Sequence, residues 1–187
     1  MVKKNACVFI SGQGSNLKNL INHSRDKGFP IRISLVICNN KLAKGIEYAK
    51  KFRIPYIFVD TQFKNYENKI LYNLKKYNIS FICLAGYMKI ISKNLIKKYQ
   101  TKIINIHPSL LPKYKGLNTF SRMLKKSEKK AGCTVHFVNE KLDSGNSIVK
   151  KTFFINTKDD EHILKKKTQL LEYKAFPEAI IKIFRNV

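Results

Sequence analysis

Short apolar runs rich in valine and isoleucine recur along the chain and predict buried β-strands. The first five runs cover residues 6–10, 33–38, 54–59, 81–85 and 103–106. Continuous apolar runs of this length are typical of strands that are covered on both faces of a sheet. We therefore expect five strands in the interior of the molecule.

Helical patterns lie between these runs. Apolar side chains recur at steps of three and four over residues 42–52 and again over residues 66–77, and Ser92 is a suitable N-cap for a third helix. Because strand and helix alternate, the pattern predicts an α/β fold. We expect a doubly wound, mostly parallel sheet with flanking helices.

The pattern changes after residue 106. A proline-bearing loop leads to a short predicted helix over residues 119–126 and to two further strands over residues 133–138 and 147–154. A long helix begins at about Asp159, and Pro177 should kink or break it because proline lacks the backbone N–H that an inner helical turn needs. With no linker or repeat, residues 1–187 read as a single domain.

Composition is that of an ordinary globular domain, with 187 residues, 44% hydrophobic and 26% charged. No apolar run approaches the roughly 20 residues of a membrane helix, so we expect a soluble, untargeted protein. The four cysteines lie in or beside apolar stretches without metal-ligand spacing, at Cys7, Cys38, Cys83 and Cys133. We interpret them as buried thiols of a protein in a reducing cytoplasm.

The charge is strongly basic, with 37 Lys+Arg against 12 Asp+Glu and a net charge of +25. Such an excess ordinarily suggests nucleic acid or a membrane surface. Nearly all of it is lysine scattered along the chain, whereas base and phosphate recognition favours arginine. We therefore favour compositional drift over a nucleic-acid footprint, and expect the field to attract phosphorylated or polycarboxylate ligands.

A glycine-containing loop follows the first predicted strand and leads directly into a helix, with the sequence Ser11-Gly12-Gln13-Gly14-Ser15-Asn16. Backbone N–H groups at that helix start would face the carboxyl edge of the sheet, where an anion can bind. A dinucleotide fingerprint needs a third glycine where this chain has Leu17, so an NAD site is disfavoured. The alternative to a phosphate site is a tight turn without a ligand.

Polar residues gather at the end of the fifth predicted strand. Asn105 and His107 alternate there, so their side chains project from one face, and buried polar groups need partners. The alternative for His107 is a core histidine bonded to a backbone carbonyl. Asp143 lies in a turn containing Gly145, where it either closes the turn or holds an imidazolium at His107.

Five segments, in order and in spacing, resemble the phosphoribosylglycinamide formyltransferases, the folate-dependent enzymes of purine synthesis. They are residues 10–16, 85–91, 105–113, 132–145 and 172–177. The resemblance implies a Rossmann-like formyltransferase fold. It also implies a nucleotide- and phosphate-binding half over residues 1–100 and a catalytic and folate-binding half over residues 101–187.

The resemblance assigns substrate contacts to individual residues. In this family the Gly-Ser-Asn after the first strand binds the phosphate of glycinamide ribonucleotide, here Gly14, Ser15 and Asn16, and a glutamate near the substrate amine corresponds to Glu172. The implied folate-binding residues are Met88, Lys89, Ile90, Ile91, Asn139, Glu140, Leu142 and Lys64.

The catalytic residues of the family correspond to Asn105, His107 and Asp143, with His136 as a supporting residue. The implied reaction moves a formyl group from N10-formyltetrahydrofolate to the amine of glycinamide ribonucleotide through a tetrahedral intermediate. Asn105 and a protonated His107 would donate to its oxyanion, and Asp143 would keep His107 cationic and relay a proton. We expect direct transfer without a metal or an acyl-enzyme. The family also implies a cis peptide bond between Leu111 and Pro112.

The chain departs from the family pattern at three positions near the implied site. Lys115 replaces a proline after Lys-Tyr, Lys89 replaces an arginine, and Ser147 replaces the proline of an Asp-x-Gly-x-Pro turn. The histidines often found after Gly-Leu are also missing. These departures bear on ligand affinity more than on the chemistry at Asn105, His107 and Asp143.

Three other functions compete with this interpretation. Methionyl-tRNA formyltransferase and formyltetrahydrofolate hydrolase share the catalytic segment, but each carries a further domain that this chain is too short to hold. A basic nucleic-acid-binding module would need exposed aromatic and arginine clusters, which the sequence lacks. We expect small-molecule partners, no membrane and no nucleic acid, and either a monomer or a homodimer.

Overall fold

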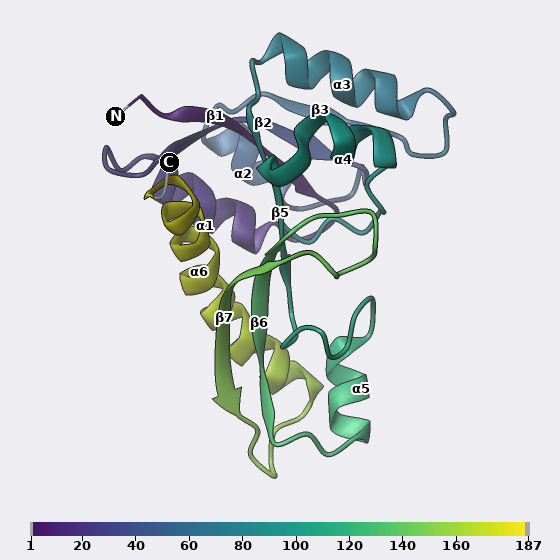
Figure 1. Cartoon of the computed structure of the whole chain (residues 1–187), viewed down its shortest axis with the longest axis vertical. Coiled ribbons are helices and arrows are strands. Elements are labelled where there is room, and N and C mark those ends of the chain that lie inside the picture. Colours follow the sequence, from purple (N-terminus) through teal and green to yellow (C-terminus); the bar gives the residue numbers. More distant parts are fainter. Residues whose placement is uncertain (1, 186–187) are drawn as a thin grey trace. The chain divides into compact units, whose positions relative to one another are not determined.

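The apolar runs in the first part of the chain form parallel β-strands, as predicted. The computed structural model describes residues 2–185, and the chain forms two compact units, one ending at Ile104 and one beginning at Asn105. In the first unit the strands neighbour one another in the order β3-β2-β1-β4, with every pairing parallel (Figure 1). Their bounds are Lys4–Ile10 for β1, Ile31–Cys38 for β2, Tyr56–Phe58 for β3 and Phe81–Leu84 for β4.

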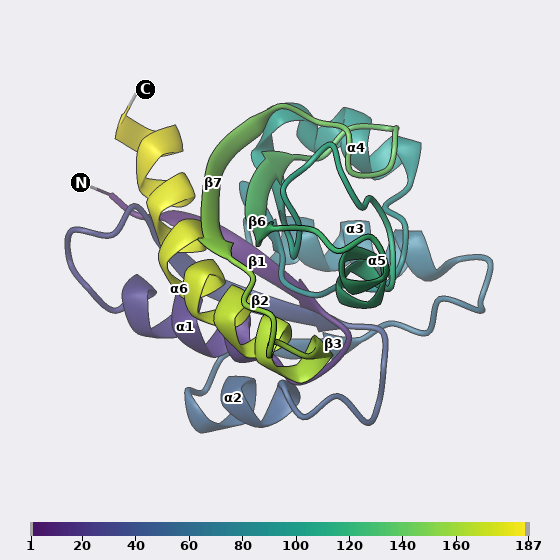
Figure 2. The same ribbon diagram turned by 90° about the horizontal axis from the view of Figure 1, so that it is seen from below.

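Helices cover both faces of this four-stranded part. They are α1 (Ser15–Ser24), α2 (Ile46–Lys51), α3 (Tyr66–Lys76) and α4 (Lys93–Tyr99), followed by a short 3-10 turn, η1 (Gln100–Lys102). Figure 2 shows α1 and α2 on one side of β1 and β2, with α3 and α4 on the other. Ser92 caps α4, since its Oγ accepts a hydrogen bond from the Leu95 N–H at 3.1 Å. Two-sided cover explains why β1 is a continuous apolar run.

The second unit joins three strands to two helices. Strand β5 (Ile103–His107) enters this unit at Asn105, and the strands neighbour one another in the order β5-β6-β7. β6 (Lys130–Phe137) and β7 (Ser147–Phe154) are antiparallel, while α5 (Thr119–Lys125) lies between β5 and β6 in the sequence. α6 (Glu161–Arg185) packs on β6 and β7 through its apolar face. The antiparallel pair makes the sheet mostly, rather than wholly, parallel.

The long last helix is not broken at its proline. α6 runs from Glu161 to Arg185 as one helix, although Pro177 lies inside it, which excludes the predicted break and leaves the predicted kink untested. Proline removes one intrahelical hydrogen bond, but the helix on both sides of it is held by burial of Ala175, Phe176 and Ala179. Packing of these side chains outweighs the local cost of the proline, a balance that helical periodicity alone does not reveal.

The predicted buried thiols are confirmed. All four cysteines are fully buried and free, and burial raises the pKa of Cys133 to about 12. A thiol in such surroundings is chemically inert because the reactive thiolate is disfavoured. None of the helices described over residues 2–185 is both long and apolar enough to cross a membrane.

Candidate active site

Strand β5 delivers two predicted catalytic side chains to one side of its pleat. His107 is 6% exposed and Asn105 is half-buried, while Ile106 between them is buried on the opposite side. Side chains alternate along a strand, so Asn105 and His107 share a face. The structure therefore brings together the pair that the sequence placed there.

The loop after β5 is held by a buried hydroxyl on β6. Thr134 Oγ1 donates to the Ser109 carbonyl at 2.7 Å and accepts from the Leu111 N–H at 3.1 Å. The Ser109 Oγ in turn donates to the Lys113 carbonyl at 2.7 Å. The Leu111-Pro112 peptide bond is cis, as the resemblance implied. The three hydrogen bonds of Thr134 and Ser109 hold the path of the chain immediately beyond His107.

Asp143 reaches this cluster from the turn between β6 and β7. Its φ of 45° is left-handed, a conformation that aspartate tolerates better than most residues. Gly145 makes the turn possible, because a Cβ at that position would lie 1.8 Å from the Phe137 carbonyl oxygen. The Asp143 side chain is 8% exposed. A tight turn thus buries a carboxylate instead of leaving it in solvent.

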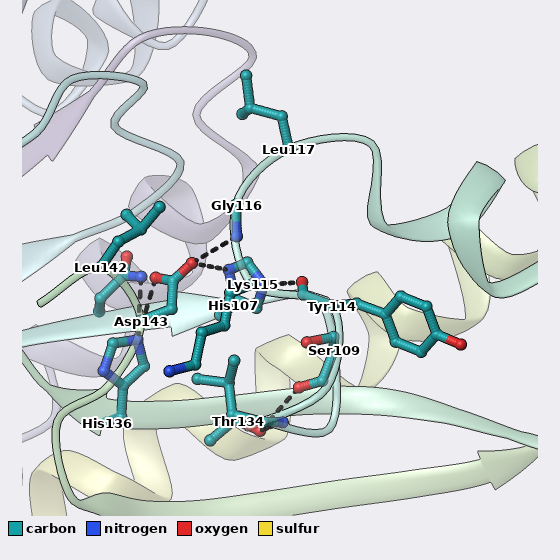
Figure 3. Close-up of polar contacts among 12 residues, drawn as sticks. His107, Ser109, Tyr114, Lys115, Gly116, Leu117, Thr134, His136, Leu142 and Asp143 are labelled. Atoms are coloured by element: carbon teal, nitrogen blue, oxygen red, sulfur yellow. Dashed lines mark hydrogen bonds and ion pairs between the residues drawn. The ribbon is translucent and has the colours of Figure 1, made fainter.

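The Asp143 carboxylate lies between two imidazoles (Figure 3). Its Oδ2 lies 3.4 Å from His107 Nδ1 and accepts a hydrogen bond from the Gly116 N–H at 2.8 Å. Its other oxygen, Oδ1, lies 3.7 Å from His136 Nε2. The carboxylate therefore serves long-range partners and does more than close its own turn.

The segment around Tyr114 completes the surroundings of His107. The Tyr114 carbonyl accepts a hydrogen bond from His107 Nε2 at 2.9 Å. The Tyr114 hydroxyl and the Lys113 ammonium both donate to Glu128 Oε1, at 2.8 and 2.9 Å, which ties the segment to the stretch before β6. Lys115, which replaces the family's proline, donates its ammonium to Ser144 Oγ.

His136, on β6, is more deeply buried than His107, at 2% against 6% exposure. Its Nδ1 contacts its neighbour's carbonyl, Phe137 O, at 2.8 Å, and its Nε2 lies 3.2 Å from Asn105 Nδ2. Burial lowers the pKa of His136, because the charged ring loses its hydration. The ring is therefore neutral around pH 7.

The predicted phosphate loop has the geometry of an anion site. α1 begins at Ser15, directly after β1 and the glycine turn, and no acidic residue lies in its first turn. A helix N-terminus carries partial positive charge and directs N–H groups outward. Gly14 adopts φ +71°, and a Cβ there would lie 2.5 Å from Gly45 Cα, so this position requires glycine.

The predicted folate residues fall into two groups, one in each unit of the chain. In the first unit Met88, Lys89 and Ile90 are exposed, whereas Ile91 is buried. The segment is anchored by the Met88 N–H, which donates to Ser11 Oγ at 2.8 Å, and Lys64 lies exposed just before α3.

In the second unit the predicted folate residues lie in the connection between β6 and β7. Asn139 and Glu140 are exposed, and the Asn139 Oδ1 accepts the Lys141 N–H at 3.0 Å. Leu142 is 55% exposed and Leu117 is 69% exposed. Figure 3 shows Leu142 beside Asp143, whereas the Leu117 side chain extends away from it, beyond Gly116.

Glu172, predicted to lie near the substrate amine, is half-buried on α6. Its charge contributes to the raised pKa of Cys133 on β6, after the larger effect of burial. Across residues 2–185, no group of three or more histidine, cysteine, aspartate or glutamate side chains has the arrangement of a metal site.

Two backbone groups in the cluster have no counterpart in the sequence prediction, the Tyr114 carbonyl and the Gly116 N–H. Main-chain groups carry no side-chain signature, so a residue pattern cannot single them out. The only available signal is the glycine itself, which adopts φ +76° in the loop after Pro112. Glycine at such a φ often marks close approach of the backbone to another group.

Comparison with known proteins extends the resemblance over most of the chain. The formyl transferase family model matches residues 4–180. The phosphoribosylglycinamide formyltransferase of Bacillus subtilis (strain 168) is 36% identical over 183 residues, which are 95% of this chain and 93% of that protein. A crystal structure of phosphoribosylglycinamide formyltransferase from Bacillus halodurans gives a TM-score of 0.92 at 32% identity, over 96% of this chain and 95% of that one.

Longer relatives contain the same region. The trifunctional purine biosynthetic protein adenosine-3 of Drosophila melanogaster is 38% identical over 184 residues, and the matched part is 14% of its length. The agreement in fold confirms the predicted α/β architecture with a mostly parallel sheet and flanking helices. On sequence and on structure, this chain belongs to the formyl transferase family.

Proposed function

We propose that this chain is a phosphoribosylglycinamide formyltransferase that works in purine synthesis. It transfers a formyl group from N10-formyltetrahydrofolate, a co-substrate, to the amine of glycinamide ribonucleotide. The observation that carries this proposal is the buried Asp143 carboxylate between two imidazoles, beside the Asn105 amide. Relatives that carry this enzyme's name match nearly the whole chain, which supports the same activity here.

The reaction is a direct transfer between two bound substrates. The amine nitrogen attacks the formyl carbon, a C–N bond forms, and the formyl oxygen becomes negative. The intermediate then collapses, the bond from carbon to the folate N10 breaks, and a proton passes from the former amine to N10. The chain must therefore stabilise an oxyanion and move one proton.

Asn105 and His107 are the proposed oxyanion donors. One N–H of the Asn105 amide remains for a ligand after the other is directed to His136. Both ring nitrogens of His107 face acceptors, the Asp143 carboxylate and the Tyr114 carbonyl, an arrangement that suits an imidazolium. We propose that the formyl oxygen replaces the Tyr114 carbonyl as acceptor of the Nε2–H.

Asp143 is the proposed proton relay and counter-ion. Its Oδ2 lies 3.4 Å from His107 Nδ1, so the carboxylate is placed to accept that N–H and to act as the counter-ion when the ring carries the transferred proton. The carboxylate also accepts a hydrogen bond from the Gly116 N–H. This bond keeps it in place while His107 gains or loses a proton. These chain groups supply the charge that the reaction needs, so we propose a metal-independent mechanism.

Substrate contacts follow the family assignment. We propose that Gly14, Ser15 and Asn16 at the start of α1 hold the ribonucleotide phosphate and that Glu172 serves its amine. The folate would contact the eight residues named in the sequence analysis. In this scheme residues 1–100 supply the phosphate site, and residues 101–187 supply the catalytic groups and the second folate-binding segment.

We further propose a cytoplasmic enzyme with small-molecule partners only. Four buried, free thiols suit a reducing compartment. Oligomeric state is proposed as monomer or homodimer, and the lysine-rich surface as an attractor of anionic substrates rather than of nucleic acid.

The assignment is tested by assaying three formyl acceptors with the same folate donor. We expect formyl transfer to glycinamide ribonucleotide, little transfer to methionyl-tRNA and little hydrolysis in water. Transfer to methionyl-tRNA or hydrolysis as the fastest reaction would move the chain to another member of the family. A crystal soaked with glycinamide ribonucleotide and a folate analogue should place the phosphate at Gly14–Asn16 and the formyl position within hydrogen-bond reach of Asn105 and His107.

A further inference from the structure

The two imidazoles beside Asp143 have different partners. His107 faces two acceptors, the Asp143 carboxylate at Nδ1 and the Tyr114 carbonyl at Nε2. His136 faces the Phe137 carbonyl at Nδ1, whereas its Nε2 faces the Asn105 amide nitrogen at 3.2 Å. The partners of His107 therefore suit a ring that carries a proton on both nitrogens. Those of His136 suit a neutral ring with one acceptor nitrogen.

Hydrogen-bond logic fixes the tautomer of His136. A carbonyl oxygen only accepts, so the contact of 2.8 Å to Phe137 O requires a proton on Nδ1. A neutral imidazole carries one N–H, and Nε2 is then an acceptor. The Asn105 amide must turn its Nδ2–H toward that acceptor, because its Oδ1 would leave two lone pairs opposed.

The surroundings of His136 keep the ring neutral. Its side chain is 2% exposed, and burial is the largest influence, lowering its pKa. The Phe137 carbonyl and Asp143 oppose this effect, while the charges of His107 and Lys115 reinforce it. The Asp143 Oδ1 is 3.7 Å away, beyond a direct hydrogen bond, so the Asn105 amide is the closer partner of Nε2.

We propose that His136 is a positioning residue that sets the orientation of the Asn105 amide. Its unprotonated Nε2 engages one N–H of Asn105 Nδ2 and so leaves the second N–H of that nitrogen for the formyl oxygen. This inference rests on the proposed function and deepens it. Without the His136 acceptor, the amide can rotate by 180° and present its oxygen to the developing oxyanion, which repels it.

Protonation of His136 would reverse this arrangement. As the pH falls through its pKa, Nε2 gains a proton and becomes a donor, which opposes the Asn105 N–H. The new N–H is drawn to Asp143 Oδ1 and the amide turns its oxygen to Nε2. Formyl transfer should therefore decline on the acid side through kcat, separately from any titration of the substrate amine.

A spectroscopic test needs no activity. In ¹⁵N-labelled protein, long-range ¹H–¹⁵N correlations report which nitrogen of each histidine carries the proton. At pH 7.5 we expect one histidine to be neutral with the proton on Nδ1, and to vanish from the spectrum of His136→Gln. If the resonances lost in His136→Gln instead show a ring protonated on Nε2, or on both nitrogens at this pH, the proposal is overturned whatever the enzyme's activity.

Two substitutions separate the acceptor from mere packing. Glutamine can offer a carbonyl acceptor that does not titrate, whereas phenylalanine fills the space without one. We expect His136→Gln to keep kcat within about 10-fold and to lose one acid-side inflection of its pH profile. His136→Phe should lose about 10²-fold in kcat, the order expected for an oxyanion donor, with KM for glycinamide ribonucleotide within a few-fold.

The control is His162→Gln, the same change at an exposed histidine on α6, which should match wild type throughout. Equal loss in the two His136 variants, with both folded, or full activity in His136→Phe, would sink the idea. Should His136→Phe fail to fold, the pH profile of His136→Gln and the tautomer measurement still decide. Absence of formyl transfer in wild type would count against the proposed function, while the tautomer result would stand independently.

Discussion

At the scale of the residue, the site depends on a few close approaches that bury charge beside complementary groups. The Asp143 carboxylate is held among His107, His136 and the Gly116 N–H. An unpartnered charge in such a place would cost several kcal/mol, so each partner supports the others. Changes at this scale should separate chemistry from stability.

Asp143→Asn should lose on the order of 10²–10⁴ in kcat while binding glycinamide ribonucleotide nearly normally. Asparagine keeps the size and the left-handed turn but removes the carboxylate charge that faces His107 Nδ1. Steady-state kinetics across pH for both proteins, with melting curves, measure this. A variant within a few-fold of wild type would return Asp143 to a purely structural role.

Gly145→Ala should destabilise the chain by about 1–3 kcal/mol, because the added methyl meets the Phe137 carbonyl at 1.8 Å and forces the turn apart. Gly28→Ala is the matched control, since a methyl there lies 3.7 Å from its nearest neighbour, an ordinary contact. Chemical denaturation compares the two. Equal stability of both variants would contradict the packing assigned to this turn.

At the scale of the element, the proposed phosphate site consists of α1 and the loop before it. The loop leaves β1 and turns at Gly14 with positive φ, and the helix starts at Ser15 with its positive end free of acidic side chains. Backbone N–H groups in this arrangement bind an anion irrespective of which phosphate ester carries it.

Asn16→Ala should raise the KM for glycinamide ribonucleotide and leave the KM for the folate nearly unchanged. The side chain is buried at the first turn of α1, where the proposal places the phosphate. Initial-rate kinetics with each substrate varied in turn check this. Equal effects on both substrates, or none, would move the phosphate elsewhere.

At the scale of the whole molecule, the net charge of +25 sets a long-range field. Both proposed substrates are anionic, and such a field raises their local concentration until salt screens it. The Debye length is about 10 Å at 0.1 M ionic strength, so the effect is sensitive to ordinary buffer changes.

Raising NaCl from about 10 mM to about 150 mM, where the Debye length shrinks from about 30 to 8 Å, should raise both KM values several-fold. The buried site, with Asp143 at 8% exposure, is screened far less, so kcat should change little. Sucrose at matched osmolality is the control. KM values that do not respond to salt would show that the charge has no part in substrate capture.

The sequence by itself indicated most of the strands and helices and the loop before α1, and its resemblance to a family indicated the three candidate catalytic side chains. A strand that is buried on both faces of a sheet needs a continuous run of apolar residues, so the strands are visible in the sequence. The two-residue period of a strand places Asn105 and His107 on one face. The glycine at position 14 likewise indicated a tight turn, because few other residues adopt the positive φ found there.

Only the tertiary structure decided which groups meet. The continuous α6 across Pro177 depends on packing against β6 and β7, which a local rule for proline omits. The Tyr114 carbonyl and the Gly116 N–H belong to the backbone, so the types of residue in the sequence do not identify them as part of the site. His136 became an acceptor for Asn105 because two strands place the side chains 3.2 Å apart, and this long-range contact has no counterpart in the order of residues along the chain.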